Sequence, residues 1–411
     1  MASKADSRLI FVDRSPRGTG SAILRGRLQR SMRTAVIGAL LGCVAAFAQV
    51  PIDPAALPPA LRETQPVAGE RPLKCEVVPI KPLLDFSLRY QSGYVARLPM
   101  KLFFGPGHRW LIRIRVTPDG GDRRPVFLGS RMRLPDIPRT NAWFEVGGGF
   151  WVGEGTYTVD WALADEAGRV CRKSWRIEVK PGGSDRTVTA AIQPNTVAAL
   201  FRHRVTGAAA RGEDLRPIRL TVLLHAAPLN PRRTRLRPGD RAMLLSSLAA
   251  LLEQLPVRSV RLILFNLDQQ KELFRQDVLT TQGLGDAVQS LNTLELGVVD
   301  YRTLGNRGGH IDLLADLVSG ELRAQPPSEL VIFLGPSSRY SDKLPPEVLA
   351  KPAGPVARFL YFRFQPYAGP TFPDSVDSAV KRLGGKTVII RWPHDLAKAV
   401  AQVKRQLAGG E

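Results

Sequence analysis

The densest group of chemically active side chains in this sequence is a basic run between Asn230 and Asp240. It holds four arginines within six residues, namely Arg232, Arg233, Arg235 and Arg237. Guanidinium groups bind carboxylates and phosphates through paired hydrogen bonds, so the run is able to bind an acidic partner. The alternative interpretation is a solvated loop, because runs of like charge are also typical of exposed segments.

Catalytic chemistry has little support in the residue pattern. The sequence contains no Gly-x-Ser-x-Gly, Walker, His-Glu-x-x-His or Cys-x-x-Cys motif. Its five histidines, at positions 108, 203, 225, 310 and 394, are spaced too widely to indicate a triad. Asp312 and Asp316 lie one helical turn apart beside His310, which is more typical of solvated helix positions than of an acid/base pair.

An apolar segment near the start of the chain predicts export. Residues 1–34 are polar and basic, and an uncharged apolar run of 14 residues follows at 35–48. This run is too short to span a bilayer, and it ends in Ala46-Phe47-Ala48, which fits a small-x-small cleavage site. Residues 1–48 are therefore predicted to be a signal peptide with an extended n-region, which places the mature protein in the periplasm or outside the cell.

Two further points about this segment stay open at the level of sequence. The chain starts at Met1 or at Met32, and either start leaves the apolar run intact. Leu40-Leu41-Gly42-Cys43 also reads as a lipobox, so a lipid anchor on Cys43 is the alternative to a released protein.

The charge of the chain depends on this cleavage. The 58 basic and 37 acidic residues give a net charge of +21, and residues 1–48 carry eight of the basic and two of the acidic ones. The mature chain then has a net charge of +15. Export argues against a nucleic-acid partner, so the charge favours a protein or another acidic macromolecule of the envelope. The 44% hydrophobic content excludes a disordered chain.

The first half of the mature chain has the alternation of half-buried strands. Between Trp110 and Val116 apolar side chains alternate with Arg113 and Arg115, which predicts one buried and one solvent-facing side. Residues 73–181 are predicted to form an all-β sandwich. Residues 49–72 contain six prolines and are predicted to be an extended leader without a packed core.

Two cysteines remain after cleavage, and they predict a disulfide. Cys171 has the parity of the buried side chains in the last predicted strand, and Cys75 alternates in phase with the first. In an oxidising compartment a single pair has only one intramolecular connectivity, Cys75–Cys171. The stretch also resembles immunoglobulin-like or fibronectin-like bacterial modules, through Gly155–Val159 followed by a turn at Asp165–Gly168.

The second half of the chain alternates strands with helices. After a connector at residues 182–216, apolar strands are expected at 220–224, 260–267, 329–334, 356–364 and 386–391, with an extra strand at 271–280. Amphipathic helices are expected at 244–255, where Asp240 is expected to be the cap, and at 284–291, 311–322 and 396–407. Residues 217–408 are therefore predicted to form a doubly wound, mostly parallel α/β sheet.

The order of these elements resembles the von Willebrand factor A domain. That family implies a divalent metal held by oxygen ligands at the carboxyl edge of the sheet. The corresponding positions here are His225, His310 and Gly335, so the resemblance implies the fold without the metal, and no cofactor is expected. A softer metal such as zinc, held by His225 and His310, is the alternative interpretation, and two polar residues filling the vacated pocket are the favoured one.

These patterns predict an exported, non-catalytic binding or assembly protein that is not an integral membrane protein after cleavage. The alternative is an envelope hydrolase with a site built from His225, His310 and Asp312 at the edge of the α/β sheet. Neither the partner nor the oligomeric state follows from the sequence.

Overall fold

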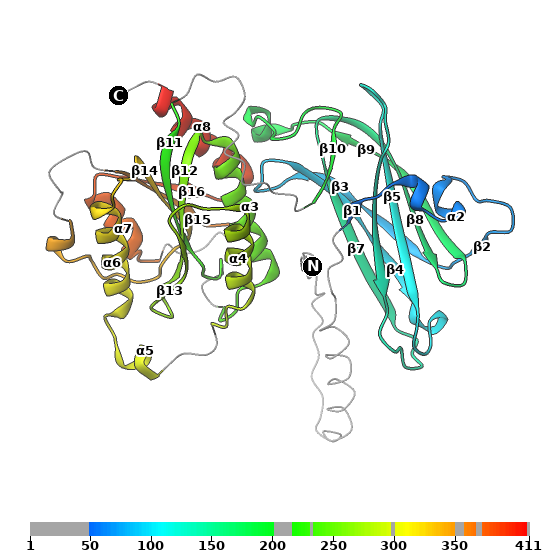
Figure 1. The fold of residues 1–411 in the computed structure, drawn as a ribbon, viewed down its shortest axis with the longest axis horizontal. Helices are drawn as coiled ribbons and strands as arrows, with labels where there is room; N and C mark the ends of the chain where they lie inside the picture. Colours follow the sequence, from blue (N-terminus) through cyan, green and yellow to red (C-terminus); the bar gives the residue numbers. More distant parts are fainter. Residues whose placement is uncertain are drawn as a thin grey trace, which may run out of the picture. The chain divides into compact units, whose positions relative to one another are not determined.

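A computed structural model describes residues 49–200, 216–230, 233–296, 301–349, 357–366 and 372–408. The predicted signal peptide and Cys43 lie outside these residues. The chain divides into two compact units (Figure 1): the described part of unit 1 is 49–83, 91–180 and 193–200, and unit 2 contains 84–90, 181–192 and the described residues from 216 onward. Among the described residues, no helix is long and apolar enough to cross a membrane.

Unit 1 is built from two sheets. One has the strand order β1-β6-β5-β8-β9-β2 and the other β10-β7-β4-β3. The strands are β1 (Val50–Pro51), β2 (Arg71–Pro72), β3 (Glu76–Leu84), β4 (Tyr90–Pro99), β5 (Arg109–Pro118), β6 (Val126–Arg133), β7 (Trp143–Val152), β8 (Gly155–Asp165), β9 (Arg169–Val179) and β10 (Val197–Ala199). Strand β10 comes from the segment that the sequence analysis assigned to the connector.

The predicted alternation in β5 is present, and it builds the core between the two sheets. Trp110, Ile112, Ile114 and Val116 are all at most 1% exposed. Aromatic rings meet across the sheets, for example Tyr94 of β4 and Trp161 of β8, whose ring centroids lie 5.3 Å apart. Period-two burial of large side chains therefore holds the two sheets together.

The glycine-rich stretch of β7 permits a close approach of two strands. A Cβ atom on Gly93 of β4 would lie 2.2 Å from the carbonyl oxygen of Gly148, so a larger residue at position 93 would clash with the neighbouring backbone. Phe150 and Trp151, which follow this stretch, are 0% and 3% exposed and close the core.

The leader expected at residues 49–72 is instead packed on the six-stranded sheet, which corrects the sequence prediction. Its first residues form β1, antiparallel to β6, and the short helices η1 (Pro54–Ala56) and α2 (Pro59–Arg62) follow. Leu57 and Leu61 are buried against Ala162 and Val170 on the outer face of the sheet. The prolines therefore shape a compact covering segment.

Arg113 explains why the outer face can be covered. Its side chain, predicted to face solvent, is fully buried and donates to three carbonyl oxygens: Leu61 at 3.0 Å, Glu63 at 2.9 Å and Asp160 at 2.9 Å. The last carbonyl groups of a helix lack intrahelical donors, and the guanidinium supplies them. Burial lowers the pKa of Arg113 to about 10, so the group is still charged at neutral pH.

Arg172 of β9 adds a second anchor for the same segment. It pairs with Glu70, and it donates to the carbonyl oxygens of Glu63 and Ala60. This ion pair, together with a hydrogen bond from the Val67 amide to Glu70, lowers the pKa of the Glu70 carboxyl against the opposing effect of burial.

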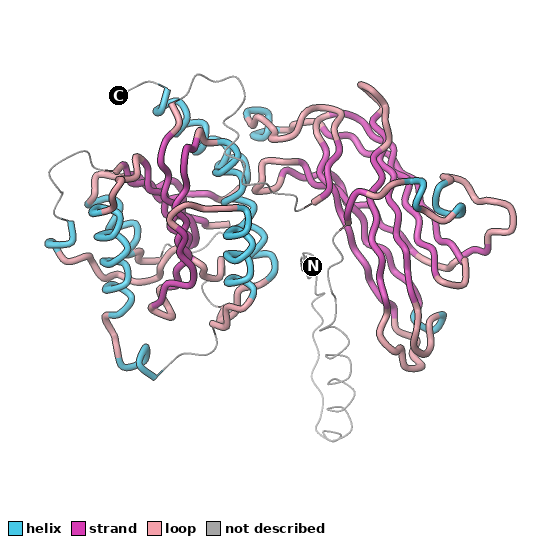
Figure 2. Tube along the Cα trace, in the orientation of Figure 1, coloured by secondary structure: helices cyan, strands magenta, loops and turns pink. Residues whose placement is uncertain are grey.

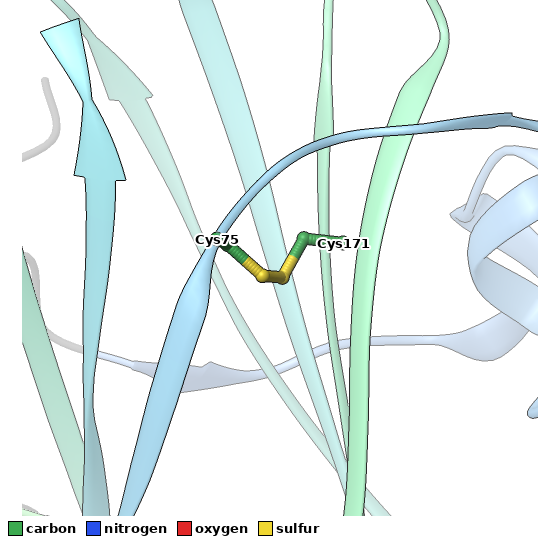
Figure 3. Close-up of a disulfide and its surroundings, with 2 residues drawn as sticks. All are labelled: Cys75 and Cys171. Atoms are coloured by element: carbon green, nitrogen blue, oxygen red, sulfur yellow. A yellow bond between two sulfur atoms is a disulfide. The ribbon is translucent and has the colours of Figure 1, made fainter.

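The predicted disulfide is present between Cys75 and Cys171 (Figure 3). Cys75 immediately precedes β3 of the four-stranded sheet, and Cys171 lies in β9 of the six-stranded sheet, so the bridge joins the two sheets. Their Cα atoms are 6.2 Å apart, and 96 positions separate them in sequence.

Unit 2 contains one six-stranded sheet with the order β13-β12-β11-β14-β15-β16. All neighbouring strands are parallel except β13, which runs antiparallel to β12. The strands are β11 (Ile218–His225), β12 (Val257–Asn266), β13 (Lys271–Gln276), β14 (Leu330–Pro336), β15 (Arg358–Phe364) and β16 (Lys386–Ile390). The helices are α3 (Pro238–Gln254), α4 (Thr281–Asn292), α5 (Tyr301–Gly305), α6 (Gly309–Arg323), α7 (Ser375–Arg382) and α8 (Pro393–Ala408), with η3 (Gly183–Thr187) and η4 (Pro346–Leu349).

Helices cover both faces of this sheet, as the alternation of strands and helices predicts. Val222 and Leu224 belong to an apolar cluster with residues of α3, α4 and α8, whereas Leu223 belongs to a second cluster with residues of α6 and α7. Figure 1 shows α3, α4 and α8 on one side of this sheet and α6 and α7 on the other, and the same arrangement is seen in Figure 2. The central strands are consequently buried on both sides.

The disulfide should contribute measurably to the stability of unit 1. Replacing both cysteines, Cys75→Ala with Cys171→Ala, should lower its unfolding free energy by about 2–5 kcal/mol, because the bridge restricts the unfolded chain. Urea unfolding followed by tryptophan fluorescence reports this unit, which holds five of the six tryptophans. Reductant should bring the wild type to the midpoint of the variant and leave the variant unchanged; equal midpoints without reductant would contradict the expectation.

Arg113 offers a second test of unit 1. Arg113→Met should lower the unfolding free energy of unit 1 by about 2–4 kcal/mol, because the Leu61 and Asp160 carbonyl groups lose their side-chain donor, whereas the Glu63 carbonyl keeps Arg172. It should also release residues 52–63 to proteolysis, which mass spectrometry of the fragments would detect. The matched control is Arg124→Met, since Arg124 is exposed in a loop of the same unit. Equal cleavage of the two variants would show that Arg113 does not hold the segment.

Candidate functional site

The carboxyl ends of the parallel strands of unit 2 meet at one edge of the sheet. His225 ends β11, Asn266 ends β12, Pro336 ends β14 and Phe364 ends β15. Ligands of open α/β sheets bind outside this edge. The edge was singled out from the sequence, and it carries most of the polar side chains that are buried in unit 2.

His225 is buried at this edge of the sheet. It is 3% exposed, its ring stacks on Phe265 of the neighbouring strand with centroids 5.1 Å apart, and its Nδ1 lies 3.1 Å from the carbonyl oxygen of Pro336. The carbonyl requires a proton on Nδ1, which leaves Nε2 as an acceptor. Nε2 is buried and has no hydrogen-bond partner among the described residues. Burial lowers the pKa of His225, so the ring is neutral at neutral pH.

Gly335 fits closely against His225. A Cβ atom at position 335 would lie 2.7 Å from the His225 carbonyl oxygen and 2.9 Å from its Cβ, and the φ of Gly335 is +149°. An aspartate at this position would therefore clash with the end of β11. The shape of the edge therefore leaves no room for a side chain at position 335.

Asp374, which the sequence analysis did not select, organises the other half of the edge. It caps α7 by accepting from the amides of Val376 and Asp377, and its Oδ1 also accepts from Ser338 Oγ at 3.0 Å. Its Oδ2 lies 3.7 Å from Nη1 of Arg363. An N-cap aspartate followed by apolar residues at helical spacing was a usable signal for this short helix.

Tyr361 joins this group to the end of β14. Its hydroxyl donates to the Pro336 carbonyl oxygen at 2.8 Å, which is the same oxygen that faces His225. Burial, and then the charge of Asp374, raise the pKa of Tyr361 well above its ordinary value. The phenol is therefore a permanent donor, and the Pro336 carbonyl is satisfied from two sides.

A second polar group lies around Asp268, just beyond β12. Asp268 pairs with Arg339 and accepts from the Tyr340 hydroxyl at 3.0 Å. Tyr340 stacks on His310 with ring centroids 3.9 Å apart, and His310 Nε2 lies 2.8 Å from Asp342 Oδ2. Burial, followed by the charge of Asp268, raises the pKa of Tyr340 to about 12.

The two predicted histidines therefore have separate partners. His225 bonds a backbone carbonyl, and His310 pairs with a carboxylate. Asp312 is exposed, and the described structure shows no hydrogen bond joining it to either histidine. Among the described residues, no three His, Cys, Asp or Glu side chains gather as metal ligands.

The arginine run precedes α3. Arg232 lies outside the described residues, Arg233 is half-buried, and Arg235 and Arg237 are exposed. Arg237 is the N-cap of α3, so Asp240, predicted to be the cap, is instead the third helical residue and accepts from the Arg237 amide at 2.9 Å. The carboxylate of Asp240 thus already lies at the positive N-terminal end of α3.

Asp240 is buried, and this has an electrostatic consequence. Burial raises its pKa, although the amide of Arg237 and the charge of Arg233 act in the opposite direction. Within the described part of the chain, the guanidinium groups of Arg233, Arg235 and Arg237 have no ion pair. They remain available to an anionic partner.

Comparison with known proteins gives no family for this chain. No protein-family model matches it, and no curated protein matches it. Among solved structures, the putative ApaA protein of Bordetella pertussis is 14% identical, covering 28% of this chain and 99% of its own, with a TM-score of 0.18. A calcium-binding mutant of Bacteroides uniformis beta-glucuronidase 2 is 11% identical over 73% of this chain and 37% of its own, with a TM-score of 0.17. At these TM-scores the similarities carry no weight for fold or activity.

The buried imidazole predicts a pH dependence of unit 2. The folded pKa of His225 is below its ordinary value of 6.5, so the unfolded chain binds the proton more readily. Its contribution to stability is complete above the unfolded pKa and is lost as the pH falls below it. Between about pH 7 and pH 5 the unfolding free energy should decrease, with a slope of at most about 1.4 kcal/mol per pH unit.

His225→Gln should flatten this slope while keeping a donor for the Pro336 carbonyl. Helical circular dichroism follows the unfolding of unit 2, because every described helix of eight or more residues lies there. Equal slopes for the wild type and the variant would mean that His225 is protonated equally in both states.

Proposed function

We propose that this chain is an exported, non-catalytic binding or assembly protein, and that its second unit is a degenerate von Willebrand factor A-like domain spanning residues 217–408. The strand order β13-β12-β11-β14-β15-β16 supports the proposal. Strand β13 follows the second strand of the sheet, β12, and is the one antiparallel strand among those described, and an extra strand at this place is the feature by which the sequence resembles that family. We further propose that unit 1, residues 73–181 with the packed leader, is an immunoglobulin-like module.

One observation carries the functional part of the proposal. The space that a metal-liganding aspartate would need at the end of β14 is filled by His225, and only glycine fits opposite it. The edge is packed with a neutral imidazole and a phenol that share the Pro336 carbonyl oxygen, and with the capping carboxylate of Asp374, which accepts from Ser338. Binding is thus proposed to use surface side chains around the edge in place of a shared metal ion.

The arginine run is the proposed binding surface. Arg233, Arg235 and Arg237 lie immediately before α3, whose N-terminus already has its own carboxylate in Asp240. An added anion is therefore expected to be recognised by the guanidinium groups. The proposed partner is a protein, or another envelope macromolecule, with a cluster of carboxylate or phosphate groups.

The hydrolase alternative has less support. A general base needs a hydrogen-bonding path to its substrate, whereas the free nitrogen of His225 is buried and His310 is engaged with Asp342. No described contact joins Asp312 to either histidine. We therefore do not assign a catalytic residue.

Affinity capture tests the proposed surface. Immobilised protein should retain a partner from the envelope fraction, identified by mass spectrometry, and replacement of all four arginines of the run by Gln should lower retention at least tenfold. The matched control removes the same charge from unit 2 at Lys386, Arg391, Lys398 and Arg405, which are exposed. Retention should survive in the control and weaken with added salt, as charge-dependent binding requires. Equal retention by both variants would exclude the run as the binding surface.

A further inference from the structure

A depression on the outer face of the six-stranded sheet of unit 1 carries an inference independent of the proposed function. Its volume is about 460 Å³, and it lies between α2 and the turn that joins β8 to β9. Pro58 and Ala60 form one wall, and Asp165, Glu166 and Gly168 of the turn form part of another. The packed leader therefore creates this depression by covering only part of the sheet.

Three arginines line the depression from two adjacent strands. Arg109 of β5 is the direct register partner of Arg133 of β6, and Arg131 lies two residues further along β6. All three are exposed, and none has a hydrogen-bonded or ionic side-chain partner in the described part of the chain. Like charges directly opposite each other on paired strands destabilise a sheet, so this arrangement is costly unless an anion neutralises it.

The acidic groups of the rim do not neutralise these arginines. Asp165 has no exposed side chain, and its Oδ2 lies 2.6 Å from Nε of Arg169. Glu166 faces His108 at 2.5 Å and accepts from the backbone amide of Arg109 at 3.0 Å. Its hydrogen bond raises the pKa of His108, which strengthens the pairing of the two groups. Both carboxylates are therefore engaged away from the three guanidinium groups.

The floor of the depression is apolar. Leu111, Ala164 and Val170 are register partners in one row across β5, β8 and β9, and Arg131 continues the row on β6. Val170 is buried, whereas Leu111 and Ala164 are half-exposed within the depression. A ligand seated here would meet apolar surface below and three cations at one side.

We propose that this depression is a binding site for a small organic anion, with a phosphate or carboxylate group on an apolar body. The guanidinium groups bind the anionic oxygens, and the apolar body rests on Leu111 and Ala164. A volume of about 460 Å³ falls within the range of small-molecule sites. The same chemistry is offered by a free metabolite and by the headgroup region of an anionic lipid.

Titration with 1-naphthyl phosphate tests the site. The purified protein should bind one equivalent saturably, more tightly than it binds inorganic phosphate or 1-naphthalenemethanol, because each of these supplies only half of the recognition. Vesicles of phosphatidylcholine with and without phosphatidylglycerol form the second arm. Vesicle binding that needs phosphatidylglycerol and the three arginines would identify a lipid headgroup as the source, whereas binding of the soluble probe alone would identify a free small molecule.

Two triple variants distinguish binding at this site from unspecific binding to positive charge. Arg109→Gln with Arg131→Gln and Arg133→Gln should weaken binding of the probe at least tenfold without lowering the thermal midpoint, because the change also removes like-charge repulsion. The control replaces Arg97, Arg124 and Arg176 by Gln, which removes the same charge at other exposed positions of unit 1 and should leave binding unchanged. Absence of saturable binding, or equal binding by the two triple variants, would overturn the proposal. The arginine run of unit 2 is unaltered in both variants, so partner capture stays a separate result.

Discussion

The Arg113 guanidinium, with its three backbone acceptors, determines how unit 1 is covered. Without this donor the Leu61 carbonyl at the end of α2 would lose its side-chain partner, and the segment with Leu57 and Leu61 would depend on Arg172 and on apolar contacts. A charged group inside a protein is tolerated when it is hydrogen-bonded, and here each guanidinium nitrogen donates to a backbone oxygen. The position of the leader and the depression beside α2 depend on this interaction, together with the contacts of Arg172 and the pairing of β1 with β6.

Buried polar groups of unit 2 also need hydrogen-bond partners, and there they fill the carboxyl edge of the sheet. His225 satisfies one ring nitrogen through a backbone carbonyl, and Tyr361 satisfies the same carbonyl from the other side. Together with Gly335 they fill the edge that the resemblance to A-type domains would reserve for a cation. Unit 2 is thereby proposed to present only side chains to a partner, and the guanidinium groups of Arg233, Arg235 and Arg237 have no ion pair within the described residues.

The sequence predicts the structure well where one periodicity dominates, and poorly where segments far apart in the chain are in contact. The alternation in β5, the cysteine pair and the strand and helix order of unit 2 could be predicted, because each depends on local spacing or on a single possible pairing. The burial of Arg113 could not, since alternation alone places it in solvent and only the leader reverses this. Helix α7 was missed because it is short, although Asp374 was a recognisable cap. The contact of His225 with Gly335 joins residues 110 positions apart and had no sequence signal.

The bridge between Cys75 and Cys171 also determines how unit 1 would bear a mechanical load. A pulling force applied to the chain on either side of the two cysteines crosses the covalent bridge, which spans 6.2 Å between Cα atoms, and bypasses the chain between them. Strands β3 to β8 lie wholly inside this closed loop and would not be extended. Under such a load the closed loop between the two cysteines would act as a short link of fixed length, and only the strands outside it could be extended.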